Sequence, residues 1–130
     1  MRVVFDSNLL VAALVLPRGT ADQTLSRVVG GADLLIVSPP IIHEVLGVLS
    51  RKFSRDREEL ARVAVFLAEI AEMVDPTHRA DVLADEPDNR ILECAVSGGA
   101  EAIVTGDRAM LCLGVYVGIS IMTLRDFLAR

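Results

Sequence analysis

The apolar residues of this chain fall into short continuous runs and into longer segments with a helical period. Continuous runs occupy residues 2–5, 34–37, 102–105 and 119–122. Runs of this length, rich in β-branched residues, are typical of strands in a parallel sheet that is covered on both faces. They predict four strands, and residues 73–76 give a weaker fifth.

Between these runs, apolar residues recur every three or four positions, which predicts helices. A helix begins after a residue whose side-chain oxygen can accept a hydrogen bond from a free backbone N–H. The residues that can start these helices are Ser7 or Asn8, Thr20, Ser38, Ser54, Asp88 and Thr123. Strands that alternate with helices predict the α/β class, with three layers around a central parallel sheet of four to five short strands.

Length and composition fit one domain, residues 1–130, because 52% of the residues are hydrophobic and can form a substantial core. No uncharged apolar run reaches about 18 residues, and Asp6 interrupts the apolar start, so neither a membrane span nor a signal peptide is expected. We therefore expect a soluble, cytoplasmic protein. Cys94 and Cys112 are too few for a disulfide scaffold, and with only His43 and His78 a zinc site is not expected.

The net charge of −5 argues against nucleic-acid binding by the whole surface, although a local basic patch stays possible. Basic residues are concentrated in and just before the helix that the pattern predicts over residues 55–71. These residues are Arg51, Lys52, Arg55, Arg57 and Arg62. Two interpretations are open: an ordinary solvated helix face, which is the more common case, or a patch for a phosphodiester backbone.

Four acidic residues are expected at one edge of the sheet. Asp6 follows the first strand directly, and Asp107 follows the strand at 102–105. Asp88 and Glu44 lie near the starts of two helices, and helices begin at the edge where parallel strands end. Like charges brought together favour a compensating cation, and oxygen-only ligands suit Mg²⁺ or Mn²⁺.

Each acid also has an ordinary structural interpretation. Asp6 and Asp88 could cap helices, Glu44 could interact favourably with a helix dipole, and Asp107 could be a turn residue. Four acids on one predicted edge are harder to explain in this way than any one of them alone.

The same residues belong to motifs that resemble the PIN-domain family. This family of small metal-dependent nucleases includes the VapC-type toxins of bacterial and archaeal toxin–antitoxin pairs. The matching segments, in order, are residues 3–10, the helix with Glu44, residues 88–95, residues 102–107 and the closing strand and helix at 121–128. The resemblance covers essentially the whole chain. Ser7 stands where a threonine is common, a change that keeps the hydroxyl group.

Position by position, the resemblance implies an acidic cluster of Asp6, Glu44, Asp88 and Asp107, with Asn8 and Thr105 as polar neighbours. Three of these acids, Asp6, Asp88 and Asp107, would hold one or two Mg²⁺ or Mn²⁺ ions. Glu44 would position the attacking water or complete the metal shell. Asp85 and Glu86 are close enough to Asp88 to compete with it for this assignment, whereas Glu93 lies more than a helical turn beyond it.

The implied function is hydrolysis of RNA phosphodiester bonds by a metal-dependent endoribonuclease. As a toxin of this family, the protein would have an antitoxin partner and would form a homodimer.

Two other classes of function stay open. One is an aspartate-dependent phosphatase or phosphotransferase with Asp6 as nucleophile. Such enzymes rely on a lysine near the aspartate, but the only lysine here is Lys52, and Asn8 stands where such phosphatases have a second aspartate. The other is a catalytically inactive PIN fold that binds RNA or protein.

Overall fold

The computed structural model describes all 130 residues. Strand β1 (Arg2–Phe5) lies inside a six-stranded sheet. The strand order is β3-β2-β1-β4-β6-β5, and every neighbouring pair is parallel except β5 and β6. The other strands are β2 (Leu34–Val37), β3 (Ala71–Met73), β4 (Ala102–Val104), β5 (Val115–Tyr116) and β6 (Ile119–Met122). The predicted α/β class with a mostly parallel central sheet is confirmed, with β5 as an additional short strand.

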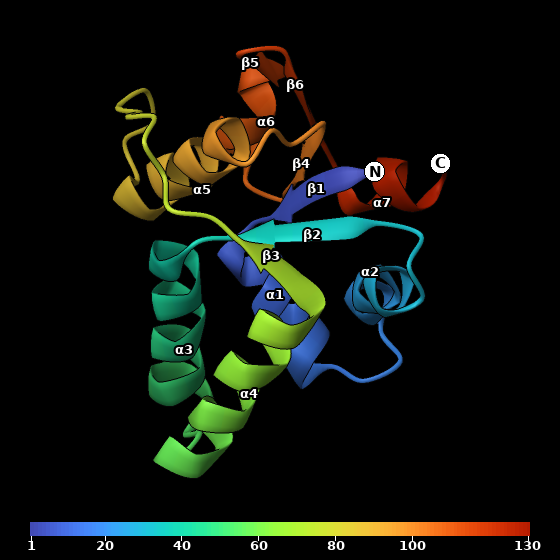
Figure 1. Cartoon of the computed structure of the whole chain (residues 1–130), viewed down its shortest axis with the longest axis vertical. Coiled ribbons are helices and arrows are strands. Elements are labelled where there is room, and N and C mark those ends of the chain that lie inside the picture. Colours follow the sequence, from blue (N-terminus) through green and yellow to red (C-terminus); the bar gives the residue numbers. More distant parts are fainter.

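Seven helices connect and cover these strands (Figure 1). They are α1 (Ser7–Val15), α2 (Thr20–Val29), α3 (Pro39–Phe53), α4 (Arg57–Ile70), α5 (Glu86–Ser97), α6 (Arg108–Leu113) and α7 (Leu124–Leu128). Figure 1 shows α2 near the end where β1 and β2 begin, and α3 and α5 near the end where these strands finish. The second end is the edge at which the acidic residues were expected.

The hydrophobic core surrounds β1, whose Val3, Val4 and Phe5 are fully buried. The ring of Phe5 meets the ring of Phe127 edge to face, with centroids 5.6 Å apart. Burial of a continuous apolar strand on both faces explains why β1 contains no alternating polar positions. The closing helix α7 is thereby fixed to the centre of the sheet.

Hydrogen bonds continue beyond the ends of the central strands. The backbone N–H of Asp6 donates to the Val104 carbonyl at 3.1 Å, and that of Thr105 donates to the Met122 carbonyl at 3.0 Å. The residues that directly follow β1 and β4 are therefore held side by side, although they are far apart in the sequence. This pairing determines the geometry of the candidate site.

Several helix starts differ from the prediction. Asp6 itself caps α1, in place of Ser7 or Asn8, by accepting a hydrogen bond from the Leu9 N–H at 2.7 Å. Asp56 caps α4 in a capping box with Glu59, whereas Ser54, the predicted cap, ends α3 with a left-handed backbone. Helix α5 begins at Glu86, whereas Asp88 was the residue predicted to start it.

Helix α2 begins after Gly19, without a side-chain cap from Thr20. The predicted caps at Ser38 and Thr123 do precede α3 and α7, and the Thr123 side chain accepts a hydrogen bond from the Asp126 N–H. Both cysteines are free, and no helix combines the length and the apolar composition needed to cross a membrane.

Candidate functional site

Asp6 forms the centre of the candidate site, at the carboxyl end of β1. Its side chain is almost completely buried, and both of its oxygens accept hydrogen bonds: one from the Leu9 N–H and one from the Thr105 hydroxyl. Burial raises the pKa of this carboxyl, and the two hydrogen bonds oppose that effect. Asp6 therefore caps α1, which was its structural interpretation from the sequence, and it also lies at the edge where the acids were expected.

Thr105 connects two of the predicted acids. Its hydroxyl donates to Asp6 and accepts a hydrogen bond from the backbone N–H of Asp107 at 2.9 Å. The carboxylate of Asp107 in turn caps α6, since it accepts from the Met110 N–H at 2.8 Å. The predicted polar neighbour Thr105 thus fixes the relative positions of Asp6 and the segment that carries Asp107.

Asp88 lies in the first turn of α5 and not at its cap, because Asp85 occupies the cap position. Partial burial, followed by the charges of Asp107, Asp85, Asp6 and Glu44, raises the pKa of Asp88 to about 6. The charges of the other three predicted acids therefore all act on the carboxyl group of Asp88. Asp85 is an additional member, which the sequence indicated only as a possible competitor of Asp88.

Two openings flank these acids. One has a volume of about 690 Å³ and is lined by Asp6, Asn8, Thr105 and Asp107, together with arginines from α6 and α7. The other, of about 470 Å³, is lined by Ser7, Glu44 and Glu86, with prolines and a histidine from α3 beside them. We call the first the arginine-side opening and the second the proline-side opening. The structure therefore divides the predicted residues: Asp6, Asn8, Thr105 and Asp107 line the arginine-side opening, Glu44 lines the proline-side opening, and Asp88 lines neither.

The residue types suit a divalent cation, but the side chains as they lie do not enclose one. The donors are all carboxylate, amide or hydroxyl oxygens, and the pKa of Asp88 is raised first by burial and then by the neighbouring acids. However, no three acidic, histidine or cysteine side chains converge closely enough to hold a metal ion. The fit of Mg²⁺ or Mn²⁺ therefore depends on the donor chemistry.

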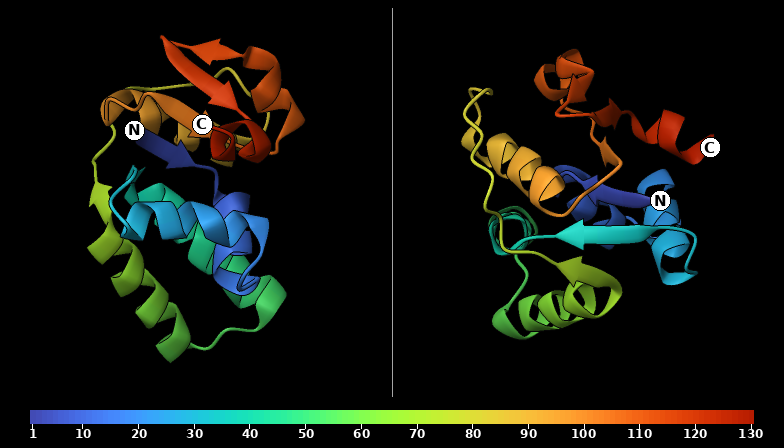
Figure 2. Two further views of the ribbon diagram at one scale, coloured as in Figure 1. Left: turned by 90° about the vertical axis from the view of Figure 1, so that its right-hand side faces the viewer. Right: turned by 45° about the horizontal axis from the view of Figure 1, so that its top comes forward.

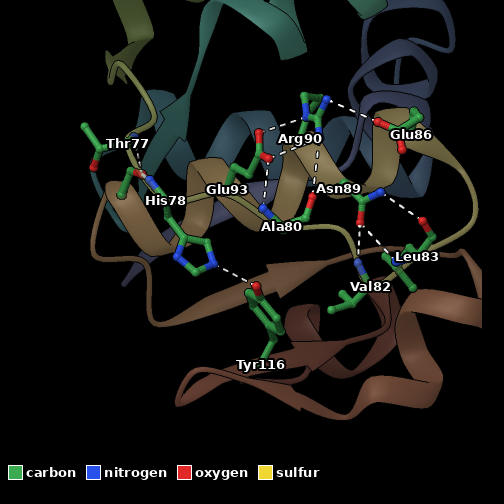
Figure 3. Close-up of polar contacts among 11 residues, drawn as sticks. Thr77, His78, Ala80, Val82, Leu83, Glu86, Asn89, Arg90, Glu93 and Tyr116 are labelled. Atoms are coloured by element: carbon green, nitrogen blue, oxygen red, sulfur yellow. Dashed lines mark hydrogen bonds and ion pairs between the residues drawn. The ribbon is translucent and has the colours of Figure 1, made fainter.

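The segment between β3 and α5, residues 74–85, leads into the helix that carries Asp88. This segment, which we call the strap, contains no helix or strand and runs alongside α5 from its last turn to its first (Figure 2). Buried Asn89 secures it: the side-chain oxygen accepts from the N–H groups of Val82 and Leu83, and the amide nitrogen donates to the Leu83 carbonyl (Figure 3).

Further side chains fix the strap to α5 and to β5, as Figure 3 shows. Buried Glu93 accepts a hydrogen bond from the Ala80 N–H at 2.9 Å and forms an ion pair with Arg90 at 2.8 Å. His78 and Tyr116 share a hydrogen bond of 2.7 Å, which ties the strap to β5. Glu93 therefore has a structural role, consistent with its omission from the predicted acidic cluster.

Only two of the five predicted basic residues are paired with acids. Arg55, just before α4, pairs with Glu59 at 3.1 Å, and Arg62 pairs with Glu58 at 2.8 Å. Such exposed pairs neutralise charge locally, whereas Arg51, Lys52 and Arg57 are exposed and form no ion pair. None of the five lines the two openings beside the acids, which favours the interpretation as an ordinary solvated face.

Lys52 lies too far from Asp6 for the phosphotransferase hypothesis. It belongs to the last turn of α3, eight residues after Glu44, and this spacing corresponds to about 12 Å along the helix axis. The end of α3 that contributes to the site is the other one. Asp6 therefore lacks the neighbouring lysine on which those enzymes rely.

Comparison with known proteins agrees with this fold. The family model described as "PIN domain" matches residues 2–109. Uncharacterized protein MJ1680 of Methanocaldococcus jannaschii is 25% identical over 117 residues, which cover 87% of this chain and 75% of that protein.

Two solved structures share the fold over nearly their whole length. VapBC2 from Rickettsia felis, bound to a DNA fragment from its promoter, gives a TM-score of 0.69 at 13% identity and is covered to 98%, with 95% of this chain. VapBC-1 from nontypeable Haemophilus influenzae gives 0.67 at 14% identity and is covered to 99%, with 96% of this chain. With the family model matching most of its length, the chain belongs to the PIN-domain family.

Proposed function

We propose that this protein is a metal-dependent endoribonuclease, the toxin of a toxin–antitoxin pair. The observation that carries the proposal is the electrostatic coupling of Asp6, Glu44, Asp107 and Asp85 to Asp88 at the carboxyl edge of the sheet. Concentrated negative charge at such an edge is costly unless a cation compensates it, and a phosphodiester substrate adds to that charge.

In this proposal, Asp6, Asp88 and Asp107 hold one or two Mg²⁺ or Mn²⁺ ions. When bound, such ions neutralise charge on the scissile phosphate and make a water molecule more acidic. Glu44 accepts a proton from the attacking water, or orients that water, from the proline-side opening. Thr105 keeps Asp6 in place through its hydrogen bond, and exposed Asn8 offers an amide to the substrate.

The proposal assigns little work to nucleophilic side chains. Phosphodiester hydrolysis is mainly a problem of charge stabilisation and of the orientation of water, and carboxylates with a cation meet both needs. A covalent route through Asp6 is disfavoured because both oxygens of this side chain already accept hydrogen bonds.

We also propose an antitoxin partner and a homodimer. The two VapBC structures support an antitoxin by analogy of fold. Large apolar side chains that remain exposed support further protein contacts: Leu16 after α1, Val29 on α2 and Val65 on α4 are each more than half exposed.

The first experiment is cleavage of a panel of structured and unstructured RNAs by the purified chain with Mg²⁺, Mn²⁺ or EDTA. We expect cleavage with a metal, none with EDTA, and a loss of at least about a hundredfold in Asp6→Asn, as for removal of a main charge-stabilising group. Asp75→Asn is the matched control, because Asp75 is exposed, follows the edge strand β3 and lines neither opening.

Absence of cleavage with any metal, by protein that is folded and free of a copurified inhibitor, would contradict the enzyme proposal. The alternative would then be a PIN fold that binds RNA or protein without turnover. In that case Asp6→Asn would leave RNA binding unchanged.

A further inference from the structure

The two openings beside the acidic edge differ in the arginine side chains that line them. We propose that Arg108 and Arg125, in the arginine-side opening, bind phosphates of the RNA strand next to the scissile bond. This inference rests on the proposed nuclease function and adds to it the side of the site along which the RNA backbone runs. Both arginines line the same opening as Asp6 and Asp107.

Neither arginine is engaged with the protein's own acids. Arg108 and Arg125 are exposed and form no ion pair, although Asp107 and Asp126 are their neighbours in the sequence. Five other arginines are paired with acids: Arg2, Arg27, Arg55, Arg62 and Arg90. The guanidinium groups of Arg108 and Arg125 are therefore free to bind an external anion.

The fold brings these two residues to the same opening. Arg108 is the first residue of α6, which follows β4, and Arg125 is the second residue of α7, which follows β6. Strands β4 and β6 are parallel neighbours in the sheet. Helices that follow neighbouring parallel strands begin at the same edge, so both side chains extend from the edge that carries Asp6.

The proline-side opening offers no comparable group. Its one arginine, Arg90, pairs with Glu93 at 2.8 Å and with Glu86 at 3.4 Å, and Glu44 and Glu86 line the opening as well. Only the arginine side therefore offers arginines that are not already paired with the protein's own acids. A guanidinium can hold two oxygens of one phosphate, and this geometry gives position as well as charge.

The test is the salt dependence of RNA binding. The full chain would be titrated into a short fluorescein-labelled single-stranded RNA, in EDTA to prevent metal-dependent cleavage, and anisotropy recorded at several salt concentrations. For single strands, each phosphate contact contributes about 0.7 to the slope of log K against log salt. We expect the double variant Arg108→Gln/Arg125→Gln to lose about 1.4 from this slope.

Arg57→Gln is the matched control, since Arg57 is also exposed and unpaired but lies at the start of α4, away from both openings. It should leave the slope unchanged. Substitution of both Arg108 and Arg125 by lysine keeps the charge, so it should restore the slope while affinity recovers only in part. In cleavage assays, the Gln double variant should raise KM about tenfold with little change in kcat.

The outcomes separate this inference from the proposed function. Cleavage with Mg²⁺ or Mn²⁺, together with an unchanged slope and KM in the Gln double variant, would overturn the role of the arginines and leave the nuclease proposal intact. A reduced slope without any cleavage by the wild-type protein would support the phosphate site and contradict the enzyme. A loss of about 0.7 from the slope in Arg57→Gln, the same loss per arginine as in the double variant, would show that only net charge matters and would overturn the inference.

Discussion

Asp88 has an unfavourable environment for its charge. Its ordinary pKa of 3.8 is raised to about 6 by partial burial and by Asp107, Asp85, Asp6 and Glu44. The folded protein therefore binds this proton more tightly than the unfolded chain does. As pH rises through the interval from about 4 to about 6, the folded state loses stability relative to the unfolded state.

Asp88→Asn should therefore stabilise the metal-free protein at pH 7. We expect a gain of about 1 kcal/mol, which is reduced from the full effect of the shift because Asp88 is partly exposed and its charge is screened. Urea unfolding in EDTA at pH 7 and at pH 4 measures it, and the difference from the wild type should disappear at pH 4. The same variant should lose RNA cleavage.

A destabilised Asp88→Asn protein at pH 7 would contradict this account of the acidic edge. Asp75→Asn, which changes an exposed carboxylate in the same way, should leave the free energy of unfolding nearly unchanged.

The four acids could be predicted at the residue level because acids that follow buried strands or begin helices stand out in an apolar sequence. The role of Thr105 in holding Asp6 could not be derived in this way. It depends on the register of β1 and β4, which pairs Phe5 with Val104 and so places the next residue of each strand side by side. The absence of ion pairs at Arg108 and Arg125 likewise depends on the three-dimensional positions of the acids, which the sequence does not give.

At the level of elements, the strap depends on a few side chains of α5 for its structure. Asn89 alone provides three hydrogen bonds to the backbone at Val82 and Leu83. Because the strap has no strand or helix of its own, loss of these bonds leaves backbone groups without partners.

Asn89→Ala should therefore loosen the strap before it unfolds the domain. We expect faster trypsin cleavage after Arg79, an exposed residue in the strap, and a loss of about 1–3 kcal/mol in the free energy of unfolding. Limited proteolysis with mass spectrometry identifies the site. Tyr116→Phe, which removes only the bond to His78, should have a smaller effect. Equal cleavage rates in Asn89→Ala and wild type would contradict the role of Asn89.

Strands β1, β2, β4 and β6 were predictable as elements because each lies in a largely apolar run, and the helices because of their period. Strand β3 covers Ala71–Met73 instead of the predicted residues 73–76, since its pairing with β2 and not an apolar run defines it. The first residues of the helices were less predictable. Asp6 and Asp56 have neighbours that can also cap a helix, namely nearby serines and Asn8, and only the backbone conformation determines which residue becomes the cap. Helix α6 has six residues and β5 has two, too few for either period to be recognised.

At the level of the whole molecule, exposed apolar surface supports the proposed homodimer. Leu16, Val29 and Val65 are 58%, 63% and 56% exposed. Light scattering at micromolar concentration should give twice the 14.0 kDa of one chain. Val65→Glu on α4 places a charge on this surface, and it should shift the mass toward one chain without loss of helical circular dichroism. A single-chain mass for the wild type would contradict the dimer.

The contact between Asp6 and Thr105 joins residues 99 positions apart. During translation, Asp6 is added 99 residues before the partner that fixes it. The acidic edge therefore cannot assemble until Thr105 and Asp107 have been synthesised. Under the proposed nuclease function, a shorter nascent chain lacks the complete site and should not cut the messenger RNA that encodes it.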